Sequence, residues 1–366
     1  MPGLTCGFIG LGLIGGSIAK AMKNYRSDIR ILAYDINKAP LEAALSEGIV
    51  DEICDTASDS AFSKCDYVFL CAPVSENDKN LAKLKDVLSP DCILTDVGSV
   101  KVTTHAAIHA LGLDDYFIGG HPMAGSEKIG YANSTPLLLE NAYYILTPTA
   151  TVARDKVIRY ESFVSNLGAI PLILNAEKHD YITAAISHLP HIIAAELVNL
   201  VQDSDNAEGL MKLIAAGGFK DITRIASSSP DMWEAICMTN TDNIRILLQK
   251  YIEYLNHALS LLDSKSSVEI HDMFASAKEY RDTFINASRG PIKKVQALHV
   301  DITDEAGAIA RTATLLADAD INIKNIGIMH NRELEDGALR IEFYDESALK
   351  KAAALLKNNN YTIYAS

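Results

Sequence analysis

The sequence lacks any run of eighteen apolar residues, so it predicts no membrane-spanning helix. Its N-terminus lacks the charged region and cleavage site of a signal peptide and goes directly into a strand-like run. Positive charge is scarce, because 33 lysine and arginine residues stand against 47 acidic residues and leave a net charge of -14. This deficit argues against nucleic acid as a partner, although it leaves room for a local basic pocket.

The chain also lacks a CxxC pair among its six cysteines, several of which sit in apolar runs. Paired or clustered cysteines are typical of disulfide frameworks and zinc sites. We therefore expect buried thiols, a reducing cytoplasmic location, and neither a disulfide framework nor a metal site. The six residues are Cys6, Cys54, Cys65, Cys71, Cys92 and Cys237.

What the chain does contain is the composition of a globular protein. Hydrophobic residues make up 48% and charged residues 22%, which is enough apolar material to bury a core. A length of 366 residues predicts two or three domains.

The N-terminal segment predicts a dinucleotide-binding unit. An apolar run, Thr5 to Ile9, leads directly into the Gly-rich sequence GLGLIG at 10–15, and a helical pattern follows. Asp35 lies twenty residues beyond Gly15, at the end of the next strand-like run. Glycines there allow a tight turn and close approach of a pyrophosphate, and the helix N-terminus faces the phosphates. A carboxylate at Asp35 accepts bonds from ribose hydroxyls and repels a 2′-phosphate, which favours NAD over NADP.

Further apolar runs predict that this unit is an α/β Rossmann domain with a parallel sheet, over residues 1–175. The runs 66–71 and 92–97 alternate with helical segments, and 141–146 and 169–174 complete the domain. Ligands lie beyond the carboxyl ends of such strands, which places Gly98 and Ser99 along the cleft. Ser99 is also a candidate helix N-cap. The expected cofactor-binding residues are Gly10, Gly12, Leu13, Ile14, Gly15, Asp35, Ala72 and Pro73.

The stretch Gly119 to Glu127, GGHPMAGSE, carries a histidine among glycine and proline residues. Glycine and proline interrupt regular structure, so we expect His121 on a fixed loop. An imidazole there can accept or donate a proton near neutral pH. The alternative is a turn histidine that only caps backbone groups.

From residue 176 to about 290 the pattern changes to long amphipathic stretches, which predict an all-α middle domain. His188 and His191 are three positions apart and share a helix face, but no third ligand for zinc is evident nearby. Glycines 217 and 218 precede an Asp221–Arg224 pair that suits an anion pocket, the alternative being a surface ion pair. Trp233, the only tryptophan, belongs to the core or to a pocket wall.

After a linker at 288–291, residues 296–366 predict strands and helices in the order βαββαβ. That order is typical of a ferredoxin-like α+β domain. The segment contains no candidate nucleophile or acid pair, so we interpret it as a binding or regulatory module.

Taken together, five stretches resemble the prephenate/arogenate dehydrogenase family, and the C-terminal segment resembles an ACT domain, an amino-acid-sensing module. The resemblance covers essentially the whole chain, and the GGHPMAGSE and SHLPH runs are its specific parts. Lys220 is a mild departure, since many relatives have another residue there. The stretches are 10–17, 96–101, 119–127, 187–191 and 217–233.

The resemblance implies oxidative decarboxylation of prephenate with NAD as hydride acceptor. His121 would take the proton of the substrate hydroxyl, and Ser99 would orient the imidazole or that hydroxyl. Arg224, His188 and His191 would neutralise the two substrate carboxylates, and Glu127 would pair with Arg224 to gate entry. The expected catalytic residues are therefore His121, Ser99, Arg224, His188, His191 and Glu127.

The expected partners are prephenate or arogenate, a second copy of the chain bound through the middle domain, and L-tyrosine as effector. Tyrosine would bind at the loop 303–307, with Asn322 and Asn325 near its amino group. Two rival functions are a β-hydroxyacid dehydrogenase, which leaves the GGHPMAGSE run unexplained, and a non-enzymatic amino-acid sensor. Prephenate and arogenate differ only in a keto or amino side chain, and the sequence leaves that choice open.

Overall fold

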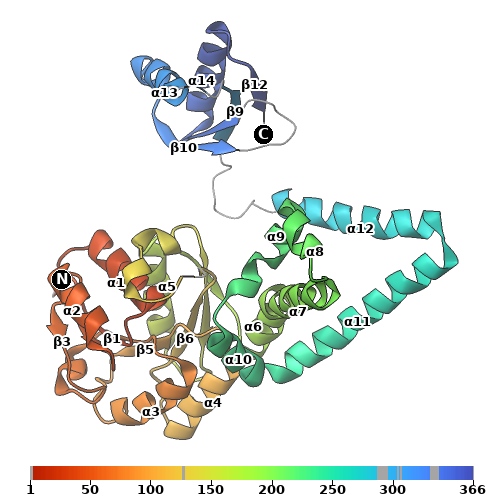
Figure 1. Ribbon diagram of the computed structural model, residues 1–366. Helices are drawn as coiled ribbons and strands as arrows, with labels where there is room; N and C mark the ends of the chain where they lie inside the picture. Colours follow the sequence, from red (N-terminus) through yellow and green to blue (C-terminus); the bar gives the residue numbers. More distant parts are fainter. Residues whose placement is uncertain are drawn as a thin grey trace. The chain divides into compact units, whose positions relative to one another are not determined.

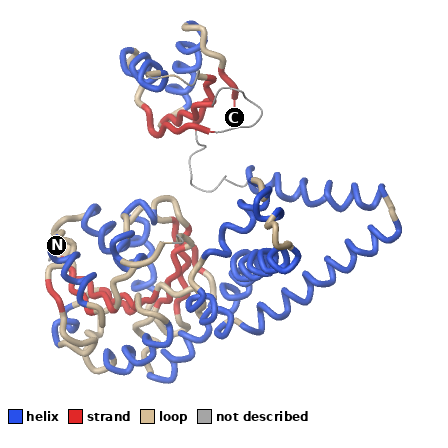
Figure 2. The backbone as a smooth tube through the Cα atoms, in the orientation of Figure 1, coloured by secondary structure: helices blue, strands red, loops and turns tan. Residues whose placement is uncertain are grey.

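The computed structural model describes residues 3–125, 128–286, 296–302, 305, 307–329 and 338–365 (Figures 1 and 2). It divides into two compact units, Met1–Ser260 and Leu261–Ser366. The expected three-domain boundaries at 175, 290 and 296 stay a prediction, and the linker at 288–291 lies outside the described residues.

A five-stranded parallel sheet forms the core of the first unit, as expected. Its strand order is β3-β2-β1-β4-β5. The strands are β1 (Thr5–Ile9), β2 (Arg30–Tyr34), β3 (Glu52–Ile53), β4 (Tyr67–Leu70) and β5 (Ile93–Asp96). Neighbouring residues of one strand, Phe8 and Ile9, belong to two separate apolar clusters, so both faces of the sheet are buried.

Helices cover the two faces of this sheet (Figure 1). Apolar residues of α1 (Leu13–Tyr25), α2 (Lys38–Ser46) and α5 (Arg154–Asn166) join the cluster that contains Phe8. Those of α3 (Val74–Leu84) and α4 (Val102–Leu111) join the cluster that contains Ile9. Short 3-10 turns are η1 (Ser60–Lys64), η2 (Tyr131–Asn133) and η3 (Pro136–Leu139).

A second sheet, of order β6-β7-β8, carries His121. Its strands are β6 (Ile118–Pro122), β7 (Tyr143–Pro148) and β8 (Ile170–Ile173), and β6 pairs antiparallel with β7 so that His121 lies opposite Ile145. The expectation that His121 sits on a loop was therefore wrong. Gly119 and Gly120 serve close packing here instead of a turn, because a Cβ at Gly120 would lie 2.6 Å from the carbonyl oxygen of Asp96.

The helical region begins with α6 (Ala176–Thr183), which continues through a π-helical turn, η4 (Ala184–His188), into α7 (Leu189–Ser204). By length and composition alone these 29 residues could cross a membrane. One such helix is weak evidence for a membrane span, because core helices of globular proteins have the same length and composition. The remaining elements are α8 (Leu210–Ile214), α9 (Gly217–Thr223), η5 (Arg224–Ser227), α10 (Pro230–Thr239), α11 (Thr241–Ser264) and α12 (Ser267–Asn286).

The C-terminal part has the predicted βαββαβ order. Its antiparallel sheet has the order β10-β11-β9-β12, which is that of a ferredoxin-like domain. Val300, Leu316, Leu339 and Leu356 are fully buried between the sheet and its two helices. The elements are β9 (Gln296–Asp301), α13 (Ala308–Asp318), β10 (Ile323–Met329), β11 (Ala338–Phe343), α14 (Glu346–Asn358) and β12 (Ile363–Ala365).

The close packing of β6 leads to a prediction for stability. Gly120→Ala should lower the free energy of unfolding by about 1–3 kcal/mol, because the added methyl group has no room beside the backbone of β5. The lower midpoint of thermal unfolding would be measured by differential scanning calorimetry. Gly218→Ala is the matched control, since a Cβ there meets nothing within 4 Å. Equal midpoints for Gly120→Ala and the unmodified protein would contradict the packing argument.

Candidate active site

The Gly-rich loop between β1 and α1 has the form of a phosphate-binding turn. Gly10 has a φ of +92°, and a Cβ on it would lie 2.6 Å from the amide nitrogen of Ala72. A Cβ on Gly15 would lie 2.9 Å from the carbonyl oxygen of Gly10. Gly12, the N-cap of α1, faces open space and offers no side-chain cap, so the first amides of α1 are available to a phosphate. These features fit a dinucleotide.

Asp35 follows β2 and is fixed beside this loop by two backbone amides. Its Oδ2 accepts a hydrogen bond from the amide of Leu11 at 2.7 Å, and its Oδ1 accepts one from Asn37 at 2.8 Å. Each carboxylate oxygen keeps a further lone pair for a ribose hydroxyl. The other expected cofactor residues occupy consistent positions, since Leu13 and Ile14 begin α1, and Ala72 and Pro73 follow β4.

A buried chain of hydrogen bonds leads from α6 to His121. The Nδ1 of His121 lies 2.8 Å from the Nε2 of His179, and the Nδ1 of His179 lies 2.7 Å from the Oδ1 of Asp180. Asp180 also accepts bonds from the amides of Lys101 at 2.7 Å and Val102 at 2.9 Å. His179 and Asp180 were not among the expected site residues, and their places at the start of a helix gave no signal.

These hydrogen bonds determine which ring nitrogen of His121 can accept a proton. An ionised Asp180 can only accept, so the Nδ1 of His179 carries a proton and donates it. The Nε2 of His179 then accepts from the protonated Nδ1 of His121. The Nε2 of His121 therefore keeps its lone pair, which is the arrangement that a general base needs.

The surroundings also keep His121 uncharged. Burial lowers the pKa of His121 well below 6.5, and the neighbouring His179, Lys101 and His188 lower it further. Lys101 is itself fully buried, where it pairs with Asp96 and donates to the carbonyl oxygen of Gly120 at 2.8 Å. At neutral pH the imidazole of His121 is therefore ready to accept a proton.

Ser99 lies in the half-buried loop between β5 and α4. The expectation that it caps α4 was wrong, because the helix begins at Val102 with Lys101 as its N-cap. The amides of Lys101 and Val102 bond to the carboxylate of Asp180 from α6 instead. Asp180 of α6 thus caps α4 in place of a residue from the preceding loop. The catalytic role of Ser99 stays a prediction.

His188, His191 and Trp233 form a second cluster. The rings of His191 and Trp233 stack with centroids 3.7 Å apart, and His188 meets Trp233 edge to face at 5.9 Å. Ser229 caps α10, the helix that presents Trp233. Burial lowers the pKa of His188 to about 4 and also lowers the pKa of His191. Both imidazoles are therefore neutral near pH 7 and would not neutralise the charge of a carboxylate. The Nδ1 of His191 donates to the carbonyl oxygen of Ser187 at 2.9 Å, so its Nε2 can only accept and does not donate to a carboxylate.

Arg224, the first residue of η5, is exposed and remains the cationic candidate of the predicted site. Glu127 lies outside the described residues, so its expected pairing with Arg224 stays a prediction. Within the described ranges, no group of three or more His, Cys, Asp or Glu side chains is arranged to hold a metal ion.

Comparisons with known proteins identify the family of this chain. Residues 18–171 match the family model of the prephenate dehydrogenase nucleotide-binding domain, and residues 175–276 match that of the prephenate dehydrogenase dimerization domain. Prephenate dehydrogenase of Bacillus subtilis is 37% identical to the chain, over 94% of the chain and 93% of its own length. Cyclohexadienyl dehydrogenase of Zymomonas mobilis is 30% identical, over 75% of the chain and 93% of its own length.

Solved structures agree with these sequence relatives. Prephenate dehydrogenase of Aquifex aeolicus, in complex with hydroxyphenyl propionate and NAD⁺, is 32% identical, with a TM-score of 0.73. The match covers 78% of this chain and 99% of that one. Arogenate dehydrogenase of Synechocystis is 28% identical, with a TM-score of 0.69, and covers 77% of this chain and 100% of its own.

The environment of Asp35 leads to a prediction about the cofactor. NAD should have the higher kcat/KM, because the fixed carboxylate repels the 2′-phosphate of NADP. Asp35→Ser should narrow the ratio of the two kcat/KM values, measured by NADH and NADPH formation. Asp28→Ser, at an exposed carboxylate that pairs with Arg26, is a suitable control. Equal kcat/KM values in the unmodified protein would overturn this reading.

Proposed function

The chain belongs to the prephenate dehydrogenase family of NAD-dependent oxidoreductases, and we propose that it converts prephenate to 4-hydroxyphenylpyruvate in tyrosine biosynthesis. The observation that supports this most directly is the buried chain Asp180–His179–His121, which leaves an unprotonated nitrogen at the end of β6. An oxidation at a carbon that bears a hydroxyl group needs such a base.

The proposed reaction balances without a net proton. Bound NAD⁺ supplies the acceptor for the hydride that leaves C4 of the substrate. His121 takes the proton of the C4 hydroxyl, which becomes a carbonyl group. The bond between C1 and its carboxylate then breaks, carbon dioxide leaves, and the electron pair completes the aromatic ring. His121 returns its proton to the phenolate oxygen, which its lowered pKa favours.

The remaining expected residues act on the substrate in this proposal. Arg224 binds one carboxylate by charge, and His188 contributes a hydrogen bond as a neutral imidazole. His191, whose Nδ1 donates to the carbonyl oxygen of Ser187, acts through Trp233, on which its ring stacks. Ser99 orients the C4 hydroxyl or the imidazole from the loop after β5. The gating role of Glu127 rests on the family resemblance alone.

We also propose that the active form is a cytoplasmic homodimer. The match to a dimerization domain covers the helices from 175 to 276. Several of these helices expose large apolar side chains that a second copy would cover. Among them are Leu200, Leu213, Ile214, Ile252, Tyr254, Leu255 and Leu259.

His121→Asn gives the main test of the proposed function. We expect kcat for prephenate to fall by about 10²–10⁴-fold, the usual contribution of a general base, with little change in NAD affinity. NADH formation measures kcat, and protein fluorescence measures NAD binding. His109→Asn is the control, because His109 is an exposed histidine on α4 whose side chain bonds to nearby Asp114. Undiminished turnover by His121→Asn would refute the assignment, and parallel assays would show whether arogenate is the better substrate.

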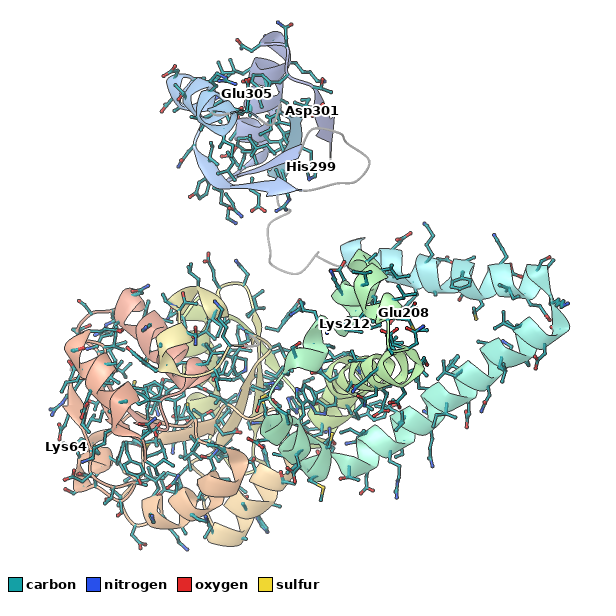
Figure 3. All side chains as sticks on the ribbon, in the orientation of Figure 1. Lys64, Glu208, Lys212, His299, Asp301 and Glu305 are labelled. Carbon is teal, nitrogen blue, oxygen red and sulfur yellow. The ribbon has the colours of Figure 1, made fainter. Side chains whose placement is uncertain are left out.

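The C-terminal domain supports a further part of the proposal, inhibition by L-tyrosine. A pocket of about 270 Å³ opens between the end of β9, the start of α13 and the turn before β12. Arg311 and Asp301 line it and offer opposite charges to the carboxylate and ammonium groups of an amino acid (Figure 3 labels Asp301 and the neighbouring Glu305). Asn322 and Asn325 are not among the lining residues, and part of the expected 303–307 loop lies outside the described residues.

Arg311→Ala should therefore weaken inhibition by L-tyrosine and leave the uninhibited kcat unchanged. Linkage requires that tyrosine weaken substrate binding by the same factor by which substrate weakens tyrosine binding. Initial rates over a range of tyrosine and prephenate concentrations would measure this. Lys350→Ala, on the exposed side of α14, is the control. If tyrosine inhibits Arg311→Ala as strongly and competes with prephenate, it binds at the His121 site instead.

A further inference from the structure

Two buried ring nitrogen atoms next to the candidate site have no hydrogen-bond partner among the described residues. They are the Nε2 of His188 and the Nε1 of Trp233, on rings that meet edge to face at 5.9 Å. A buried donor without a partner is costly, so such atoms indicate a missing acceptor. For the tryptophan nitrogen, donation is its only role. Whether His188 also donates depends on which nitrogen carries its proton.

Asn240, the residue that follows α10, decides this question. Its Nδ2 lies 2.8 Å from the carbonyl oxygen of Asp180, which can only accept, so the orientation of the amide group is unambiguous. Its Oδ1 accepts a hydrogen bond from Asn243 at 2.8 Å. The second hydrogen of Nδ2 is then directed to the Nδ1 of His188, 3.2 Å away.

This contact assigns the tautomer of His188. Because Nδ2 of Asn240 donates, Nδ1 of His188 must accept, and the single proton of the neutral ring lies on Nε2. A protonated ring would place a second N–H group against the amide N–H of Asn240. The surroundings of His188 also keep its ring neutral. Burial of His188, which is 1% exposed, lowers its pKa, and so do the neighbouring His179 and His191, whereas Asp180 raises it.

We propose that Asn240 is a positioning residue that holds His188 as a neutral Nε2–H donor, and that His188 and Trp233 together bind the side-chain carboxylate group of the substrate. The identity of that ligand rests on the proposed function. The tautomer assignment does not, because it follows from contacts within the protein. The pair binds the carboxylate through two N–H groups and leaves charge pairing to Arg224.

Asn240→Asp tests the proposal, because a carboxylate accepts from Nδ1 of His188 and moves the proton away from Nε2. We expect KM for prephenate and Kd for 4-hydroxyphenylpropionate to rise by roughly tenfold or more, the loss of a hydrogen bond to a charged group. The value of kcat should change much less, since binding in the ground and transition states is weakened equally. Asn199→Asp, at an exposed position on α7, adds the same charge and should have no such effect.

A double-mutant cycle separates positioning from a general structural role. His188→Gln keeps a neutral N–H donor near the position of Nε2 but has no tautomer to set. If Asn240 acts through His188, Asn240→Asp should raise KM much less in the His188→Gln background than in the unmodified protein. Equal effects in the two backgrounds would show that Asn240 only supports the fold, and would overturn the proposal.

Nitrogen NMR of histidine-labelled protein gives a readout that does not depend on turnover. His188 should be protonated at Nε2 alone in the unmodified protein, and should gain a proton at Nδ1 in Asn240→Asp. Protonation at Nδ1 in the unmodified protein would refute the tautomer assignment. If the unmodified enzyme failed to oxidise prephenate, the proposed function would fail, but the tautomer and the affinity for 4-hydroxyphenylpropionate would still decide the role of Asn240.

Discussion

The buried carboxylate of Asp180 is the group on which the rest of the site depends. A buried charge is stable only when it is fully hydrogen-bonded. The carboxylate of Asp180 accepts hydrogen bonds from the backbone amides of Lys101 and Val102 and from the imidazole of His179. The first two bonds hold α6 against the N-terminus of α4, where a negative charge is favoured. The third bond determines the proton positions of His179 and, through it, of His121.

Two histidines of the site end with opposite roles at the same ring nitrogen. In His121 the Nδ1 donates to His179, so Nε2 accepts, whereas in His188 the Nδ1 accepts from Asn240, so Nε2 donates. Both rings are buried, and burial lowers both pKa values. The partner of the other nitrogen, and not the residue type, therefore decides whether a neutral histidine acts as a base or as a hydrogen-bond donor.

The position of His121 depends in turn on close packing between the two sheets of the first unit. Gly120 has no side chain, which allows β6 to lie against the backbone of β5. The buried pair of Lys101 and Asp96 bridges the same gap, because Lys101 donates to the carbonyl oxygen of Gly120 and Asp96 accepts from its amide. His121, one residue further, is placed by this backbone contact and needs no mobile loop.

The sequence by itself determined the features that depend on local pattern. Apolar runs that alternate with helical segments predicted the parallel sheet, the GLGLIG turn with Asp35 predicted a dinucleotide site, and the order of elements after residue 296 predicted the ferredoxin-like domain. These signals are local because strand and helix periods, glycine turns and the spacing to Asp35 can all be counted along the chain.

Only the tertiary structure decided the proton arrangement of the site. The glycines beside His121 are typical of a loop when only the sequence is considered. The packing of Gly120 against β5 depends on Asp96, which is more than twenty positions away in the sequence. His179, Asp180 and Asn240 are ordinary polar residues of helical segments until the fold places them beside β6, α4 and His188. Hydrogen bonds over such separations have no period or spacing in the sequence, so the direction of each proton became evident only from the assembled contacts.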